Sequence, residues 1–146
     1  MVLVTFSNTY NGYANQITVA VIDLEVPEYL KLQQISLSDR LRSELVNTGK
    51  FTVVERNKMK QILEEQELPL YGIVDSKSAA KIGKLLGAKQ IIAGSISKIG
   101  SIFSISTRIV DSESGEIIVT ADMDCECPIE DVLTIVLKNV AVKLAN

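Results

Sequence analysis

The sequence has 146 residues and contains no histidine. Histidine is the usual general base near neutral pH and the commonest ligand of protein-bound metals. Its absence excludes most familiar hydrolase and metalloenzyme sites. We therefore expect a non-enzymatic protein with no cofactor and no metal.

Cysteine is almost as scarce, with only Cys125 and Cys127. Side chains two residues apart on a strand run parallel, so the sequence predicts that these thiols do not bond to each other. A Cys-x-Cys pair could bind a thiophilic metal, but zinc takes four ligands and the chain offers no third cysteine. We interpret the pair as small apolar residues packed beneath a helix, an interpretation that leaves the redox compartment open.

Concentrated positive charge is also lacking. The 15 Lys+Arg residues are outnumbered by 18 Asp+Glu residues, which gives a net charge of -3, and the basic residues are scattered among acidic neighbours. Nucleic-acid partners require a concentrated cationic surface, so no such partner is expected.

Long apolar runs are missing as well. Residues 17–24 form one of the longest, and Thr18 and Asp23 interrupt it. Such a run is too short to cross a bilayer, and we expect no transmembrane segment. The first sixteen residues contain neither a basic leader nor a lipidation cysteine. We predict an N-terminal arm over residues 1–16, followed by a single domain over residues 17–146.

The apolar residues that are present follow regular periods. Two short runs, residues 17–24 and 51–54, predict buried strands of a largely parallel sheet. Ser36 with Asp39 has the form of a capping box, and Gly49 that of a left-handed helix stop. The predicted helices cover residues 36–49, 57–67 and 75–86, the last with Asp75 as its N-cap and Gly87 at its end.

The second half of the chain has a different pattern. From residue 90 to about residue 126 the apolar period is two, which predicts three antiparallel strands with turns near residues 98–101 and 111–115. Pro128 then opens a last helix. The predicted fold is α/β, with helices packed on a mixed sheet of about five strands and a C-terminal antiparallel three-strand meander.

Charged residues follow the first two predicted strands. Asp23 and Glu25 stand where open α/β sheets keep their ligand crevice, and they could bind a cation or form a polar strand exit. Glu55 and Arg56 could bind a partner, because a guanidinium recognises a carboxylate in two-point geometry, or could fasten the strand to the next helix. We favour the structural role for both pairs and keep Glu55 and Arg56 as candidate partner contacts.

The last helix carries more apolar surface than one sheet requires. Ile135, Leu137 and Val142 extend it beyond the predicted inward face. We expect these three residues to contact either the N-terminal arm or another protein chain. The predicted inward face consists of Val132, Leu133, Val136, Val140 and Leu144.

Residues 51–66, FTVVERNKMKQILEEQ, run from a strand into an amphipathic helix through Glu55 and Arg56. With IIAGSI at residues 91–96 and VDSESGEII at residues 110–118, they resemble the CsgG-like (curli production assembly/transport) lipoprotein family. Penicillin-binding-protein activator lipoproteins and the TolB N-terminal domain are similar in the same way. The resemblance implies a bacterial cell-envelope module for protein–protein interaction, assembly and oligomerisation.

Two other functions stay open at this point. One is a small-ligand- or metal-binding domain that uses Asp23, Glu25 and Arg56, and the other is a nucleic-acid-binding domain with an anticodon-binding-like fold. The resemblance also implies an export or lipidation signal. We therefore expect a periplasmic, outer-membrane-associated protein if such a signal has been removed, and a cytoplasmic one otherwise.

Overall fold

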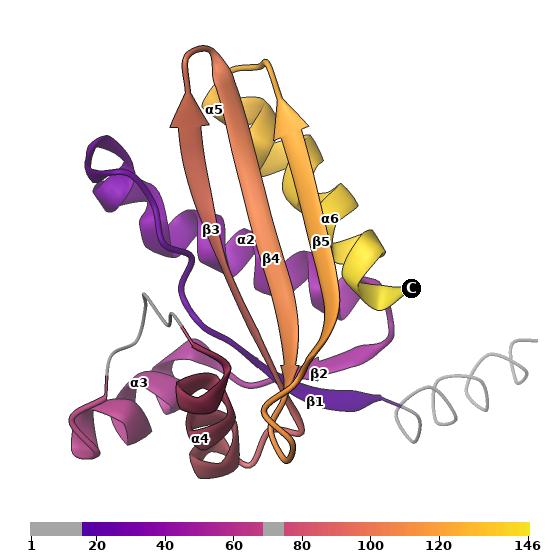
Figure 1. Cartoon of the computed structure of the whole chain (residues 1–146). Helices are drawn as coiled ribbons and strands as arrows, with labels where there is room; N and C mark the ends of the chain where they lie inside the picture. The colour runs from indigo at the N-terminus through magenta and orange to yellow at the C-terminus, as the bar shows by residue number, and fades with distance from the viewer. Residues whose placement is uncertain (1–15, 69–74) are drawn as a thin grey trace, which may run out of the picture.

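A computed structural model describes residues 16–68 and 75–146. They form a five-stranded sheet in the order β2-β1-β3-β4-β5 (Figure 1). β1 (Ile17–Val21) pairs in parallel with β2 (Phe51–Val53) and with β3 (Gln90–Ile99). β4 (Ile102–Asp111) and β5 (Ile117–Cys125) complete an antiparallel meander with β3. The predicted mixed sheet and meander are confirmed, while the predicted arm, apart from Gln16, lies outside the described residues.

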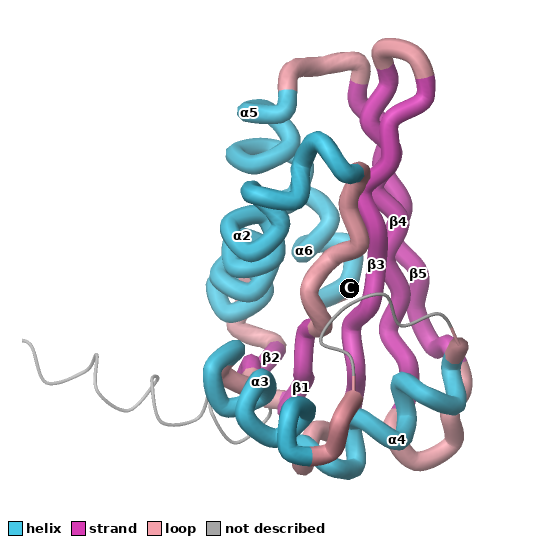
Figure 2. The backbone as a smooth tube through the Cα atoms, turned by 90° about the vertical axis from the view of Figure 1, so that its left-hand side faces the viewer, coloured by secondary structure: helices cyan, strands magenta, loops and turns pink. Residues whose placement is uncertain are grey.

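Helices pack on both faces of this sheet (Figure 2). One face is covered by α2 (Gln34–Asn47) and by a C-terminal helical segment. That segment consists of α5 (Ile129–Asp131), a π-helical turn η2 (Val132–Val136) and α6 (Leu137–Ala145). The other face is covered near β1 by α3 (Arg56–Glu65) and α4 (Ser76–Leu86). A short 3-10 helix, η1 (Glu28–Gln33), precedes α2.

The alternation of β1 divides its buried side chains between two cores. Val19 and Val21 belong to the core beneath α2 and α6, whereas Ala20 and Ile22 belong to the core beneath α3 and α4. Successive side chains of a strand point to opposite faces, so a continuous apolar run is what a strand covered on both sides requires. The continuous apolar run that predicted β1 therefore reflects the burial of both faces of this strand by helices.

The helix ends agree with the predictions at α4 and differ at α2. Asp75 Oδ1 accepts a hydrogen bond from the Ser78 N–H at 2.7 Å, and Gly87 has φ +66°, as predicted for α4. The predicted start at Ser36 is wrong, because η1 leads directly into α2 at Gln34, and the N-cap residue Gln33 is helical and makes no side-chain cap. Among the described residues, no helix combines the length and apolarity needed to span a membrane.

Candidate functional site

The carboxylate of Asp23 is held by two arginines just beyond β1. Asp23 is 3% exposed. Arg42 Nη2, from α2, lies 2.6 Å from Oδ1 and also donates to the Val21 carbonyl at 2.6 Å. Arg56 Nη2, from the start of α3, lies 2.7 Å from Oδ2, and its Nε lies 3.1 Å from each oxygen. The hydrogen bond to Asp23 raises the pKa of Arg56, which therefore stays charged.

This geometry decides between the two interpretations of the strand-end acids. Both oxygens of Asp23 are occupied by guanidinium groups, so the structural role is confirmed for Asp23. Glu25 is exposed, and its backbone pairs with β3, with the N–H donating to Gly94 at 3.0 Å and the carbonyl accepting from Ile96 at 2.8 Å. Over residues 16–68 and 75–146, no three His, Cys, Asp or Glu side chains gather in a way that could hold a metal ion.

Glu55 and Arg56 have different surroundings. Arg56 has a structural contact, but it fastens the first turn of α3 to the end of β1 through Asp23 and not to the preceding strand β2, as was predicted. Glu55 is exposed and makes no side-chain cap of α3. Together with Ile35, Asp39 and Asn57, the two residues line a hollow of about 320 Å³. Partner contact at Glu55 and Arg56 remains a prediction.

The C-terminal helix exposes two of the three predicted apolar residues. Ile135 is 54% exposed and Val142 is 45% exposed, whereas Leu137 is 0% exposed and belongs to the core beneath α2 and α6. The prediction that Leu137 lies outside the inward face is wrong. Leu137 follows Leu133 by four residues and precedes Val140 by three, which is the spacing of one helical face.

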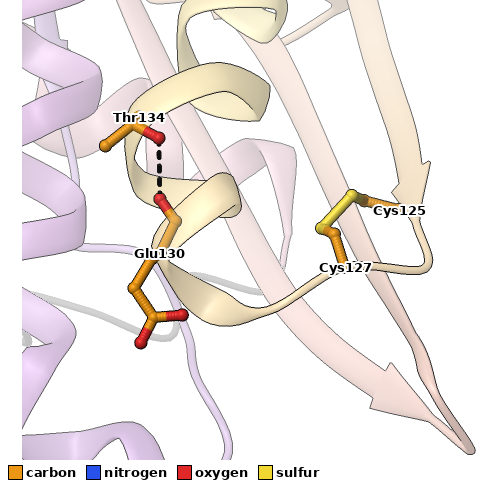
Figure 3. The surroundings of a disulfide bond; sticks show 4 residues. All are labelled: Cys125, Cys127, Glu130 and Thr134. Carbon is orange, nitrogen blue, oxygen red and sulfur yellow. Dashed lines mark hydrogen bonds between the residues drawn. A yellow bond between two sulfur atoms is a disulfide. The ribbon is translucent and has the colours of Figure 1, made fainter.

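Cys125 and Cys127 form a disulfide, and the prediction that they stay unbonded is wrong (Figure 3). That prediction placed both residues on one strand, but β5 ends at Cys125 and the chain bends at Cys127. The Cα atoms are 5.3 Å apart, which is a normal spacing for a disulfide. The predicted apolar packing is confirmed, because both residues contact the core beneath α2 and α6.

One surface was missed by the sequence analysis. A groove of about 670 Å³ runs between α4 and the turn that joins β4 to β5. Lys77, Lys81 and Lys84 line it, together with the exposed side chain of Leu85. The signal was present, since lysines spaced four and three residues apart share one side of a helix. The description of the basic residues as scattered overlooked this row.

The chain is similar to known proteins both in sequence and in fold. The family model of the curli production assembly/transport component CsgG matches residues 13–107, which is more than half of the chain. A search of curated protein sequences found no significant match.

Several solved structures share the fold. The LpoB C-terminal domain from Salmonella enterica superposes with a TM-score of 0.64 at 19% identity, over 82% of this chain and 90% of that domain. A PelC dodecamer from Paraburkholderia phytofirmans gives 0.58 at 13% identity, over 90% of this chain and 91% of the PelC chain. TolB from Acinetobacter baumannii gives 0.54 at 12% identity, over 88% of this chain but only 28% of TolB. The expected resemblance is confirmed, and the chain belongs to the CsgG family.

Proposed function

We propose that this chain is a non-enzymatic interaction and assembly module of the bacterial cell envelope. The observation that carries the proposal is the outward side of the C-terminal helix. Ile135 and Val142 are seven residues apart, so they lie on the same side of the helix, and both are about half exposed. Exposed aliphatic side chains repeated on one helical side are typical of surfaces that bind another protein.

The family and the fold support this role. The matching family is described as a curli production assembly/transport component. One of the proteins that share the fold is a lipoprotein, GNA1162 from Neisseria meningitidis, and another, PelC, is a dodecamer. By analogy, the chain docks to an envelope protein or to a second copy of itself.

The disulfide supports an extracytoplasmic location. Disulfides persist in oxidising compartments such as the bacterial periplasm and are rare in the cytosol. We therefore favour a periplasmic, outer-membrane-associated protein over a cytoplasmic one. Residues 17–146 act as a single domain in this proposal, because both cores share β1 and one sheet.

The chemistry of the strand ends supports a role without turnover. Asp23, the acid at the expected crevice, is neutralised by Arg42 and Arg56 and is buried. A buried carboxylate that is bound by two guanidinium groups is a poor general base, because both of its oxygens already accept charged hydrogen bonds. The same contacts disfavour the alternative of a cation site at Asp23.

In-cell photo-cross-linking tests the proposal. A photoreactive amino acid is placed at position 135 or 142, and at position 46 as the control, because Val46 is 52% exposed on α2. We expect the same discrete protein adduct at positions 135 and 142 and none at position 46. The double variant Ile135→Asp/Val142→Asp should abolish the adduct formed from a probe at position 138, which lies between them. Equal labelling at positions 46, 135 and 142 would contradict the proposal.

A further inference from the structure

The groove beside α4 has an unusual charge for this protein. The chain carries a net charge of -3, yet Lys77, Lys81 and Lys84 form a row along one side of α4. We call these three residues the lysine row. All three are exposed, and none forms an ion pair with another described residue. Like charges three and four residues apart destabilise a helix by about 0.2–0.5 kcal/mol per pair, so the row brings no benefit to the isolated helix.

The rest of the groove favours a protein occupant. Its wall opposite the row contains the turn residues Glu113, Ser114 and Gly115, and Leu85 adds an exposed apolar side chain. A groove that combines apolar surface with a line of cations fits a polypeptide whose carboxylates are spaced along one side.

This chain carries such a segment. Asp122 and Asp124 are alternate residues of β5, so their side chains point to one side, and Glu126 is the first residue after the strand; all three are exposed. We call them the acidic row. None of them forms an ion pair among the described residues, and Lys143 Nζ donates at 3.3 Å to the backbone carbonyl of Asp122. Within the row, Glu126 Oε1 accepts a hydrogen bond from the Ser101 hydroxyl at 2.9 Å.

The two rows match in number. Lys77 and Lys84 are separated by about 10.5 Å along a helix at 1.5 Å per residue. Asp122 and Asp124 are separated by about 6.6 Å along a strand at 3.3 Å per residue, and Glu126 follows directly after the end of β5. Each row carries three charges on exposed side chains, and flexible lysine side chains can adjust to the spacing of the carboxylates. β5 is an edge strand, so the acidic row is accessible.

The rows cannot meet within one molecule. α4 lies at the foot of the meander, beside the turn that joins β4 to β5, and β5 runs away from it toward α5 (Figure 1). Asp122 and Asp124 pair with Ser106 and Ser104, well along the sheet from that turn. Contact between the rows therefore requires two molecules, and because the two surfaces differ, the association is head to tail.

We propose that the groove beside α4 binds the acidic row of a second copy of this chain. The inference rests on the proposed function, because self-association is one form of the docking described above. It uses α4 and β5, whereas the cross-linking test uses α6. Adducts at positions 135 and 142 with no association through the rows would retain the proposed function and overturn this inference alone.

Sedimentation velocity of the full chain provides the first test. We expect concentration-dependent association at low salt, about 50 mM, and its loss at about 500 mM, because salt screens exposed charges. A chain that stays monomeric at low salt over the whole accessible concentration range would overturn the proposal.

Charge reversal provides the decisive test. Lys81→Glu/Lys84→Glu and Asp122→Lys/Asp124→Lys should each raise the dissociation constant by at least about tenfold. An equimolar mixture of the two variants should associate again, because each reversed row meets a complementary row on the other variant. The matched control is Lys58→Glu/Lys60→Glu on α3, which makes the same charge change at exposed lysines and should leave association unchanged.

Circular dichroism confirms that each variant is folded. If a reversal prevents folding, Lys81→Gln/Lys84→Gln and Asp122→Asn/Asp124→Asn replace it, and each should weaken association. Failure of the mixture to associate overturns the inference. So does retention of the chain on heparin or DNA through the lysine row without self-association, because the occupant would then be a polyanion.

Discussion

Arg56 binds both carboxylate oxygens of Asp23, with Nη2 2.7 Å from Oδ2 and Nε 3.1 Å from each oxygen. Arg42 reaches the same carboxylate from α2. The buried carboxylate of Asp23 thus joins the end of β1 to the middle of α2 and the start of α3. The sequence places these three residues up to 33 positions apart.

Replacing Asp23 by asparagine should destabilise the protein strongly. The buried guanidinium of Arg42 would lose its charged partner, and such a loss typically costs about 3–5 kcal/mol. Urea unfolding measures the difference. The control is Asp39→Asn, which removes an exposed partner of the same arginine, 2.7 Å from Nη1, and should cost less than about 1 kcal/mol. Equal losses in the two variants would show that the buried pair is not the link described here.

The N-cap of α4 should make stability depend on pH in acid. The Ser78 N–H and hydroxyl donate to the Asp75 carboxylate and lower its pKa below the usual value. A carboxylate whose pKa is lowered by folding contributes stability that is complete above the unfolded-state pKa, about 3.9, and is lost as the pH falls through the folded-state pKa.

The variant Asp75→Asn isolates this effect, because an amide oxygen can still cap the helix but does not titrate over this range. We expect the difference in unfolding free energy between wild type and variant to be constant above pH about 4 and to shrink below it. Asp111→Asn should behave alike, because the Ser114 N–H lowers the pKa of Asp111 in the same way. A difference that does not vary with pH would contradict the assignment.

The sequence predicted best those elements whose signals are local. Asp75 and Gly87 mark the ends of α4 by backbone chemistry alone, and the structure has both. The meander followed from the period of two. At α2 the capping-box pattern of Ser36 and Asp39 did not mark the helix start, because the helix already runs through Ser36. Within this helix the Ser38 hydroxyl accepts a hydrogen bond from the Leu24 N–H at 2.9 Å and donates one to the Gln34 carbonyl at 2.7 Å.

The contacts of the candidate site were harder to predict, because they depend on which residues are close in space or on where a strand ends. A structural role was predicted for Arg56, but within the junction of β2 and α3. Its actual partner, Asp23 at the end of β1, could not be predicted, because local sequence does not specify which residues pair across a sheet. The disulfide was missed because it depends on β5 ending at Cys125. Leu137 was recoverable, since helical spacing alone places it beside Leu133 and Val140.

Gly94 should tolerate no side chain. A Cβ at this position would lie 2.4 Å from the backbone oxygen of Ser106 and 2.8 Å from Thr107 Cγ2. The contact is with the neighbouring strand, which cannot move without breaking its pairing, so Gly94→Ala should cost about 1–3 kcal/mol.

Gly100 is the matched control for Gly94. It has φ +61°, and no atom lies within 4 Å of the place that a Cβ would take, so only backbone conformation disfavours a side chain there. Asparagine tolerates the left-handed region, so Gly100→Asn should be better tolerated than Gly100→Ala. At position 94, asparagine should be no better than alanine. Thermal unfolding of the four variants distinguishes the two kinds of glycine, and a rescue by asparagine at position 94 would contradict the steric explanation.

The disulfide should contribute modestly to stability. Cys125 and Cys127 close a ring of three residues, and loop-closure entropy for so short a loop amounts to about 1–2 kcal/mol. The variant Cys125→Ser/Cys127→Ser should lose this amount in urea unfolding, and the reduced wild type should match it. Added reductant should leave the variant unchanged, while alkylation followed by mass spectrometry confirms that both wild-type thiols are free.

Ser101→Ala, which removes the hydroxyl that donates to Glu126, controls for general disturbance of this end of the sheet and should change stability by less than about 0.5 kcal/mol. If the reduced wild type is as stable as the oxidised protein, the disulfide does not constrain the chain between β5 and α5.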